Sequence, residues 1–147
     1  MLAKYLQYLC ILIETDMAKT KDKDNKNGAA APPDAVEVIA QAMLDKKGQE
    51  VVSFDLRKIG TSICDYFVIC NADSTTQVVA ISDNVEDMME ERCGRRVLRK
   101  QGRENAFWVI LDYSDVVVHI FKTDQREFYR LEDLWADAVK TTYDDQQ

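Results

Sequence analysis

The sequence predicts a single-domain α/β protein in which helices flank a mixed five-stranded β-sheet. Two observations predict this class. Segments with helical spacing of apolar residues alternate with shorter runs of Val, Ile, Phe and Leu, in the order helix, two strands, helix, three strands, helix. The part that shows this pattern, residues 34–140, is long enough for one hydrophobic core. It contains no internal repeat and no apolar run long enough to cross a membrane.

The two ends of the chain are expected to lie outside this domain. Residues 18–31 are rich in Lys, Asp and Asn and have little to bury, so residues 1–33 are predicted to form a disordered N-terminal arm. Met17 begins a segment that looks like a natural start, and we hypothesise that residues 1–16 are not translated. Residues 141–147 are predicted to be a flexible tail.

Capping patterns place the first two helices. Each begins with a capping box and ends at a glycine. The residues are Asp34, Glu37 and Gly48 for the first helix and Ser74, Gln77 and Gly94 for the second. A third helix is predicted over residues 124–139, because Phe128, Leu131, Trp135 and Ala138 recur at helical spacing.

Five strands are predicted between the helices, at residues 50–57, 65–70, 95–100, 107–111 and 116–121. The second is a continuous apolar run, which indicates a central strand. The third carries charges on both faces, which suits a sheet edge. The last two are joined at Tyr113 and Ser114, close enough for an antiparallel hairpin.

Charge and cysteine content exclude some classes of function. The net charge of −7 disfavours nucleic acid and favours a basic protein partner. The chain has four cysteines without a C-x-x-C spacing and one histidine, so no zinc site is predicted. Cys64 and Cys70 are expected to be buried thiols in a reduced, cytoplasmic setting.

The sequence disfavours two catalytic interpretations. Asp112 and Asp115, with Asp55 and Asp65 near other strand ends, could hold magnesium for phosphoryl transfer. A nucleotidyltransferase would need a second acid two residues after Asp65, where Phe67 stands. His119 could be a general base, but no motif supplies its nucleophile. No catalytic, cofactor-binding or metal-binding residue is therefore predicted.

Two surfaces are candidates for binding a macromolecule. The stretch from Trp108 to His119 combines aromatic residues with Asp112 and Asp115 and could bind a basic protein. The alternative, that Trp108 and Tyr113 complete the core, is equally open. A basic run could touch nucleic acid, although a solvated edge strand is the favoured interpretation. The run comprises Arg92, Arg95, Arg96, Arg99, Lys100 and Arg103.

From residue 34 to residue 138 the chain resembles the ribosomal silencing factor family, also called Iojap-like proteins. Four ordered blocks carry the resemblance. They are residues 65–70 (DYFVIC), 77–86, 108–121 (WVILDYSDVVVHIF) and 126–135 (REFYRLEDLW). Ser114 departs from the family pattern, because glycine is usual at that position.

The resemblance implies a non-enzymatic repressor of translation. Such proteins bind a basic protein of the large ribosomal subunit, the fourteenth in the large-subunit naming series, and block docking of the small subunit when nutrients are scarce. The fold is implied to be like that of nucleotidyltransferases without their catalytic carboxylates, and a homodimer and a secondary contact with rRNA are compatible with it. The residues that inherit the partner-binding role are Trp108, Asp112, Tyr113, Ser114, Asp115, Val117 and His119. The alternative function is a nucleotidyltransferase-like enzyme that uses Asp65 and Asp112.

Overall fold

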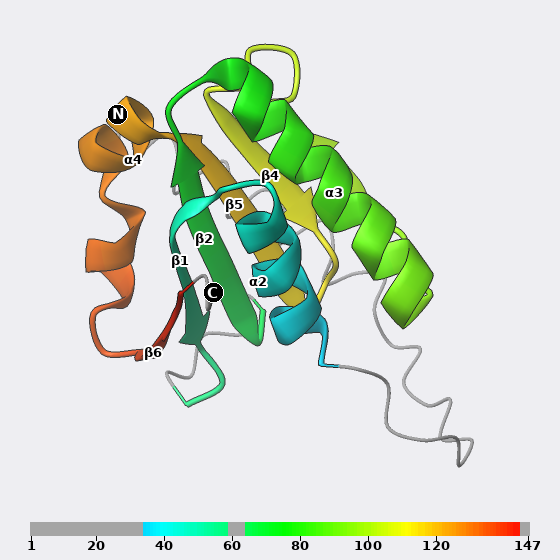
Figure 1. The fold of residues 1–147 in the computed structure, drawn as a ribbon. Helices are drawn as coiled ribbons and strands as arrows, with labels where there is room; N and C mark the ends of the chain where they lie inside the picture. The colour runs from blue at the N-terminus through cyan, green and yellow to red at the C-terminus, as the bar shows by residue number, and fades with distance from the viewer. Residues whose placement is uncertain (1–33, 59–63, 145–147) are drawn as a thin grey trace. The chain divides into compact units, whose positions relative to one another are not determined.

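A computed structural model describes residues 34–58 and 64–144, so the expectations for the N-terminal arm and for a start at Met17 lie outside the described residues. The described part is an α/β domain built on a mixed sheet with the strand order β3-β4-β5-β2-β1-β6 (Figure 1). The predicted fold class is confirmed, with six strands in place of five. The strands are β1 Gln49–Asp55, β2 Tyr66–Ala72, β3 Arg99–Gln101, β4 Trp108–Asp112, β5 Val116–Lys122 and β6 Val139–Tyr143.

The centre of the sheet is a parallel pair. β2 and β5 run side by side from Tyr66 opposite Val116 to Ala72 opposite Lys122. The other neighbouring strands in the described sheet pair antiparallel. β4 and β5 form the predicted hairpin, and β3 lies at the edge as predicted. Because β2 is apolar from Phe67 to Cys70, it can be buried on both faces, as a central strand must be.

Two helices cover one face of the sheet, α2 (Ala35–Asp45) and α3 (Thr75–Cys93) (Figure 1). Asp34 caps α2 by accepting the N–H of Val36 at 3.0 Å, and Ser74 caps α3 by accepting the N–H of Gln77 at 3.2 Å. The side-chain amide of Gln77 donates to the carbonyl oxygens of Lys46 and Lys47 at the end of α2. Gln77, predicted as part of the second capping box, therefore also joins the two helices to each other.

The hydrophobic core lies between these helices and the sheet. Alternate residues of β5 point into it, and the residues between them point to the opposite face. Cys70 is fully buried and Cys64 nearly so, as predicted. Residues that α2, α3, β2 and β5 contribute to this core include Ile39, Met43, Val78, Ile81, Val68, Val118 and Ile120. No helix in residues 34–58 and 64–144 is both long and apolar enough to span a bilayer.

The prediction of one helix over residues 124–139 is wrong. Helix α4 (Thr123–Tyr129) ends at Arg130, whose φ of 47° lies in the left-handed region, and a 3-10 helix η1 (Leu131–Trp135) follows. The chain then enters β6, which pairs with β1 from Val51 opposite Tyr143 to Asp55 opposite Val139. Residues 141–143, predicted as tail, are therefore part of the sheet. β2 pairs with one side of β1, and β6 supplies partners for the backbone groups on the other side, which would otherwise be an open edge.

The strand predicted at residues 95–100 is shorter than expected, because β3 begins only at Arg99. Gly94 ends α3 in the left-handed region with a φ of 62°. The N–H of Arg95 then donates to the carbonyl oxygen of Met89 at 3.1 Å, which closes the helix end as a Schellman motif does. Arg95 therefore belongs to the end of α3 and not to the edge strand.

Candidate functional site at the β4–β5 turn

Residues 113–115, here called the apex turn, join β4 to β5 in an uncommon conformation. Ser114 has a φ of 77°. The N–H of Asp115 donates to the carbonyl oxygen of Tyr113 at 3.1 Å, so the hydrogen bond spans a single residue. A γ-turn with positive φ at its central residue is rare and strained, and for serine it costs free energy that glycine would not. The structure thus holds strain at the centre of the predicted binding stretch.

Contacts from three elements hold the apex turn in place. The carboxylate of Asp112, at the end of β4, accepts the N–H of Ser114 at 2.8 Å. The carbonyl oxygen of Asp115 accepts the N–H groups of Asp65 at 2.8 Å and Tyr66 at 3.0 Å, which ties the turn to β2. Arg95, from the end of α3, donates to the carbonyl oxygen of Tyr113 at 2.7 Å and forms an ion pair with the carboxylate of Asp115. Backbone strain persists only where the surroundings fix it in this way.

The predicted binding residues divide into two layers. Ser114 is partly exposed and Asp115 is exposed. The other five have less than a tenth of their surface exposed: Trp108, Asp112, Tyr113, Val117 and His119. In the chain alone, the side chains of this set that a partner could reach are those of Ser114 and Asp115, and the other five are buried. Tyr113 packs with the core under the helices, and burial raises the pKa of its hydroxyl.

His119 is built into the opposite face of the sheet. The indole N–H of Trp108 donates to Nδ1 of His119 at 3.0 Å, and the ring of Phe67 meets the imidazole edge to face at 5.0 Å between centroids. Burial lowers the pKa of His119 to about 3, so the imidazole is neutral at physiological pH. Because Nδ1 accepts a hydrogen bond, the proton of the neutral ring sits on Nε2. This placement gives His119 the role of a buried hydrogen-bond acceptor.

Four aspartates, here called the acidic row, lie at one end of four adjacent strands. Asp55 ends β1, Asp65 precedes β2, Asp115 precedes β5 and Asp112 ends β4. The sequence had placed them near strand ends, and the strand order brings them to the same end. Among the described residues, no group of His, Cys, Asp or Glu side chains is arranged to hold a metal ion.

Three members of the acidic row are engaged in contacts with the protein itself. Asp55 pairs with Arg57 at 2.8 Å, and the hydrogen bonds from Arg57 lower the pKa of Asp55 to about 2. Asp112 holds the N–H of Ser114, and Asp115 pairs with Arg95. The pair that the enzymatic alternative would use, Asp65 and Asp112, therefore includes one carboxylate that is buried and already bonded to the turn.

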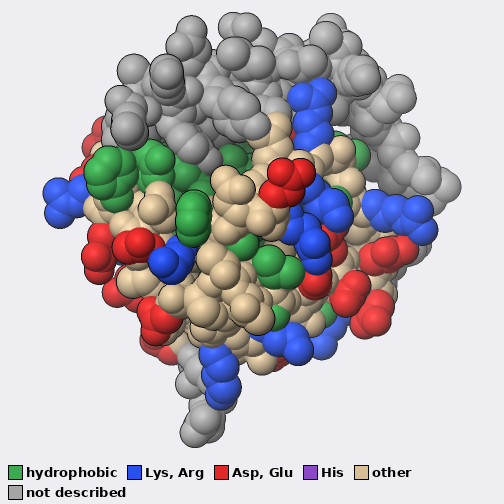
Figure 2. Space-filling model, turned by 90° about the horizontal axis from the view of Figure 1, so that it is seen from above, with side chains coloured by type: hydrophobic (Ala, Val, Ile, Leu, Met, Phe, Trp, Pro, Cys, Tyr) green, Lys and Arg blue, Asp and Glu red, His purple; other side chains and the backbone are tan. Residues whose placement is uncertain are grey.

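Acidic side chains of α3 form ion pairs with residues of the basic run. Arg96 pairs with Glu90 at 3.1 Å and Lys100 with Glu86 at 3.0 Å. Arg103 makes a bidentate contact with Asp83, at 3.0 Å to each carboxylate oxygen. Figure 2 shows Lys and Arg side chains interspersed with Asp and Glu on the face that it presents. This pattern supports the interpretation of the run as a balanced, solvated edge.

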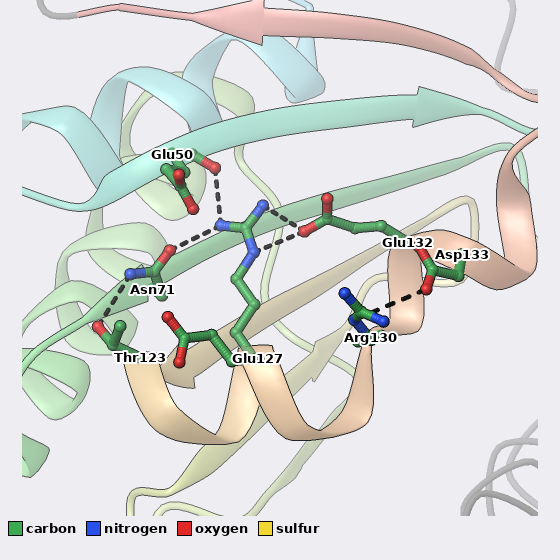
Figure 3. A pocket seen from close by; sticks show the side chains of 8 residues that line it. Glu50, Asn71, Thr123, Glu127, Arg130, Glu132 and Asp133 are labelled. Atoms are coloured by element: carbon green, nitrogen blue, oxygen red, sulfur yellow. Dashed lines mark hydrogen bonds and ion pairs between the residues drawn. The ribbon is translucent and has the colours of Figure 1, made fainter.

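A shallow hollow beside α4 contains an arginine that sequence reasoning did not single out. Figure 3 shows Asn71, Glu50 and Glu132, from β2, β1 and η1, around the hollow. Arg126 Nη1 donates to the carbonyl oxygen of Glu50 and to Oδ1 of Asn71, both at 2.8 Å, and Nε donates to Glu132 at 2.6 Å. These contacts use the buried guanidinium to fasten α4 and η1 to the sheet. The role of Arg126 depends on contacts between elements that are distant in sequence, and no local sequence pattern predicts such contacts.

Comparisons with known proteins agree with the earlier resemblance. A family model described as "Ribosomal silencing factor during starvation" matches residues 29–147. The ribosomal silencing factor RsfS of Bacillus subtilis is 39% identical over 103 residues, which cover 70% of this chain and 86% of that protein. The chloroplastic protein Iojap of Arabidopsis thaliana is 32% identical over 125 residues, which cover 82% of this chain and 52% of that protein.

Solved structures show the same fold. A crystal structure of a Chromobacterium violaceum protein superposes with a TM-score of 0.68 at 29% identity, covering 73% of this chain and 88% of that one. A crystal structure from Bacillus halodurans gives a TM-score of 0.61 at 35% identity, covering 75% and 96%. With a family model over most of its length and relatives near 40% identity along most of theirs, the chain belongs to the ribosomal silencing factor family.

Proposed function

We propose that this protein represses translation by binding a basic protein of the large ribosomal subunit and blocking the docking of the small subunit. The partner is the basic protein that the family resemblance implies, the fourteenth of the large-subunit naming series. The binding surface is centred on the apex turn, and the protein acts in the cytoplasm when nutrients are limiting. Family membership supports the assignment to the ribosome.

The observation that most supports this binding surface is the apex turn, which is strained and is held in place by contacts from three elements. A serine at a φ of 77° is held by three elements and lies at the surface next to an aspartate. Strained backbone that its surroundings fix is found preferentially at functional sites. Hydrogen bonds from Arg95, to Asp112 and from the N–H groups of Asp65 and Tyr66 fix the turn, so a partner would meet a preorganised surface, which reduces the entropy lost on binding.

Charge supports a basic protein as the partner. The chain carries a net charge of −7, and Asp65 of the acidic row is exposed next to the apex turn, to which its N–H is bonded. Complementary charge increases the rate of encounter and disfavours wrong partners. Three of the six cations of the basic run form ion pairs with acids of α3, and Arg95 pairs with Asp115, so the proposal does not include a contact with rRNA.

The proposed mechanism needs no chemical step. An interface of about 800 Å² on each partner is enough for a specific complex, and a domain of this size bound at a subunit-joining surface excludes the other subunit by volume. The result is competition: the silencing factor and the small subunit cannot occupy the large subunit together.

Purified subunits test the proposal. On a sucrose gradient the protein should comigrate with large subunits, be absent from joined ribosomes and reduce the yield of joined ribosomes in proportion to its occupancy. Ser114→Arg places bulk and positive charge on the apex turn and should weaken large-subunit binding by about 10-fold or more. Glu91→Ala, an exposed change on α3, is the matched control. Comigration of the protein with joined ribosomes would rule the mechanism out. Separately, sedimentation of the free protein in the same buffer measures whether it forms a dimer.

A further inference from the structure

Arg95 is fixed at its backbone by the end of α3 and reaches the apex turn with its side chain. Its N–H closes the helix end through the carbonyl oxygen of Met89. Its guanidinium then contacts both residues that flank Ser114. Nη2 donates to the carbonyl oxygen of Tyr113 at 2.7 Å, and Nη1 lies 3.3 Å from the carboxylate of Asp115.

The contacts of Arg95 span the strained residue. The guanidinium pairs with both oxygens of the Asp115 carboxylate and lies 5.8 Å from the ring centroid of Tyr113. Asp112 fixes the N–H of Ser114. The oxygen before Ser114 and the side chain after it are therefore held by a single planar group. Arginine suits this geometry because its rigid, planar fork holds a carbonyl and a carboxylate in fixed positions, whereas a lysine ammonium offers its donors from one flexible atom.

The ion pair also changes what Asp115 offers to a partner. An exposed carboxylate on an acidic surface would ordinarily be read as a contact for a basic protein. Here both of its oxygens contact the guanidinium of Arg95, a residue of the same domain. Its negative charge is already compensated, and its contribution to attracting a second cation is correspondingly reduced.

We propose that Arg95 is the positioning residue of the apex turn. It holds residues 113–115 in the conformation that the ribosomal partner recognises, and Asp115 acts inward as the anchor for Arg95. This inference rests on the proposed function for its binding readout. It assigns a role to a residue that the sequence placed in a basic edge strand, and it changes the role of Asp115 from partner contact to internal support.

A double-mutant cycle on the full chain separates the two roles of Asp115. Arg95→Gln and Asp115→Asn are each expected to weaken binding to purified large subunits by about 10-fold, the size of one lost hydrogen bond to a charged group. The double variant should be no weaker than either single one, because both changes remove the same anchor. A double variant weakened by about 100-fold would show independent contacts and overturn the inference. Arg95→Lys should lie between the wild type and Arg95→Gln.

Hydrogen exchange in the free protein tests the anchor without the ribosome. Arg95→Gln should increase the exchange rate of the Ser114 and Asp115 amides by about 10-fold, whereas Arg96→Gln, which removes the pair with Glu90, should leave them unchanged. Thermal unfolding checks that both variants are folded. If the wild type fails to bind large subunits, the proposed function is wrong. The amide exchange rates of the free protein then still test whether Arg95 holds the turn. If it binds and Arg95→Gln changes neither exchange nor affinity, the inference falls alone.

Discussion

His119 shows how a sequence can indicate the face of a sheet on which a residue lies without revealing its partner. Because side chains alternate along a strand, His119 shares a face with Val117 and Phe121, opposite to the face that Val116, Val118 and Ile120 present to the core. Its partner could not be predicted, because Trp108 stands opposite Phe121 and reaches His119 diagonally. Only the register of the hairpin brings the indole N–H to Nδ1. A residue that looked like a candidate base is a buried acceptor.

The buried imidazole predicts a specific dependence of stability on pH. The pKa of His119 is about 3 in the folded protein and about 6.5 in the unfolded chain, so the unfolded state binds the extra proton between these values. The stability that the neutral ring contributes is complete above pH 6.5 and is lost as the pH falls towards 3. We expect a loss of up to about 1.4 kcal/mol per pH unit below pH 6. Urea unfolding at pH 7 and pH 5 measures this loss in the free energy of unfolding. His119→Asn should remove the part of the pH dependence that comes from the imidazole. Parallel curves for the two proteins would contradict the prediction.

Ser114→Gly tests the strain in the apex turn. Glycine adopts a φ of 77° without steric cost, but it also increases the entropy of the unfolded chain. The two effects oppose each other, and we expect a net gain of roughly 0.5 kcal/mol in the free energy of unfolding. Ser114→Ala keeps the side-chain penalty and should give no gain. The comparison requires only denaturant titrations, and equal midpoints for the two variants would show that the turn is unstrained.

At the scale of elements, the sequence predicted correctly the helix ends that depend on contacts between neighbouring residues. Caps at Asp34 and Ser74 and the stop at Gly94 predicted the ends of α2 and α3, because capping depends on neighbours in sequence. The C-terminal segment was mispredicted because its fate depends on β1, nearly 90 residues earlier in the chain. Helical spacing from Phe128 onward outweighed the β-branched residues of β6, although those residues were the available signal.

Arg126 should be the main fastener of the segment formed by α4 and η1. Arg126→Ala leaves the carbonyl oxygen of Glu50 and the carboxylate of Glu132 without their cation, and the lost pair is largely buried. We expect the free energy of unfolding to fall by about 3 kcal/mol. Arg96→Ala, whose pair with Glu90 is exposed, should change it by less than about 0.5 kcal/mol. Similar losses for the two variants would mean that the network around Arg126 contributes little.

At the scale of the whole molecule, composition indicated a class of partner, a basic protein, but not a place of contact. The net charge of −7 and the absence of nucleotide-binding motifs favoured protein binding, and the family comparisons agree with a ribosomal factor. The seven residues of the predicted surface come from one short stretch, residues 108–119, but only Ser114 and Asp115 are accessible, because Tyr113 packs in the core under the helices and the other four are buried elsewhere. Closeness in sequence therefore did not show which side chains can face a partner, and Arg95 reaches the turn from another element.

Electrostatic steering gives a prediction for the binding rate. If an acidic protein approaches a basic partner, the association rate with large subunits should fall as salt is raised, because ions screen attraction beyond about 10 Å at 0.1 M ionic strength. The dissociation rate should change much less. Stopped-flow fluorescence at several salt concentrations and constant magnesium measures both rates. An association rate that is independent of salt would place the contact away from the acidic row.

The parallel pair at the centre of the sheet has a consequence for how quickly the protein folds. Tyr66 and Val116 lie opposite each other although they are about 50 residues apart, with α3, β3 and β4 between them. The central strands can join only after a long loop closes, and that entropy is lost before the pairing compensates for it. Refolding should therefore take milliseconds to seconds. Until β5 docks, β2 exposes two apolar faces, and this interval is when aggregation competes with folding.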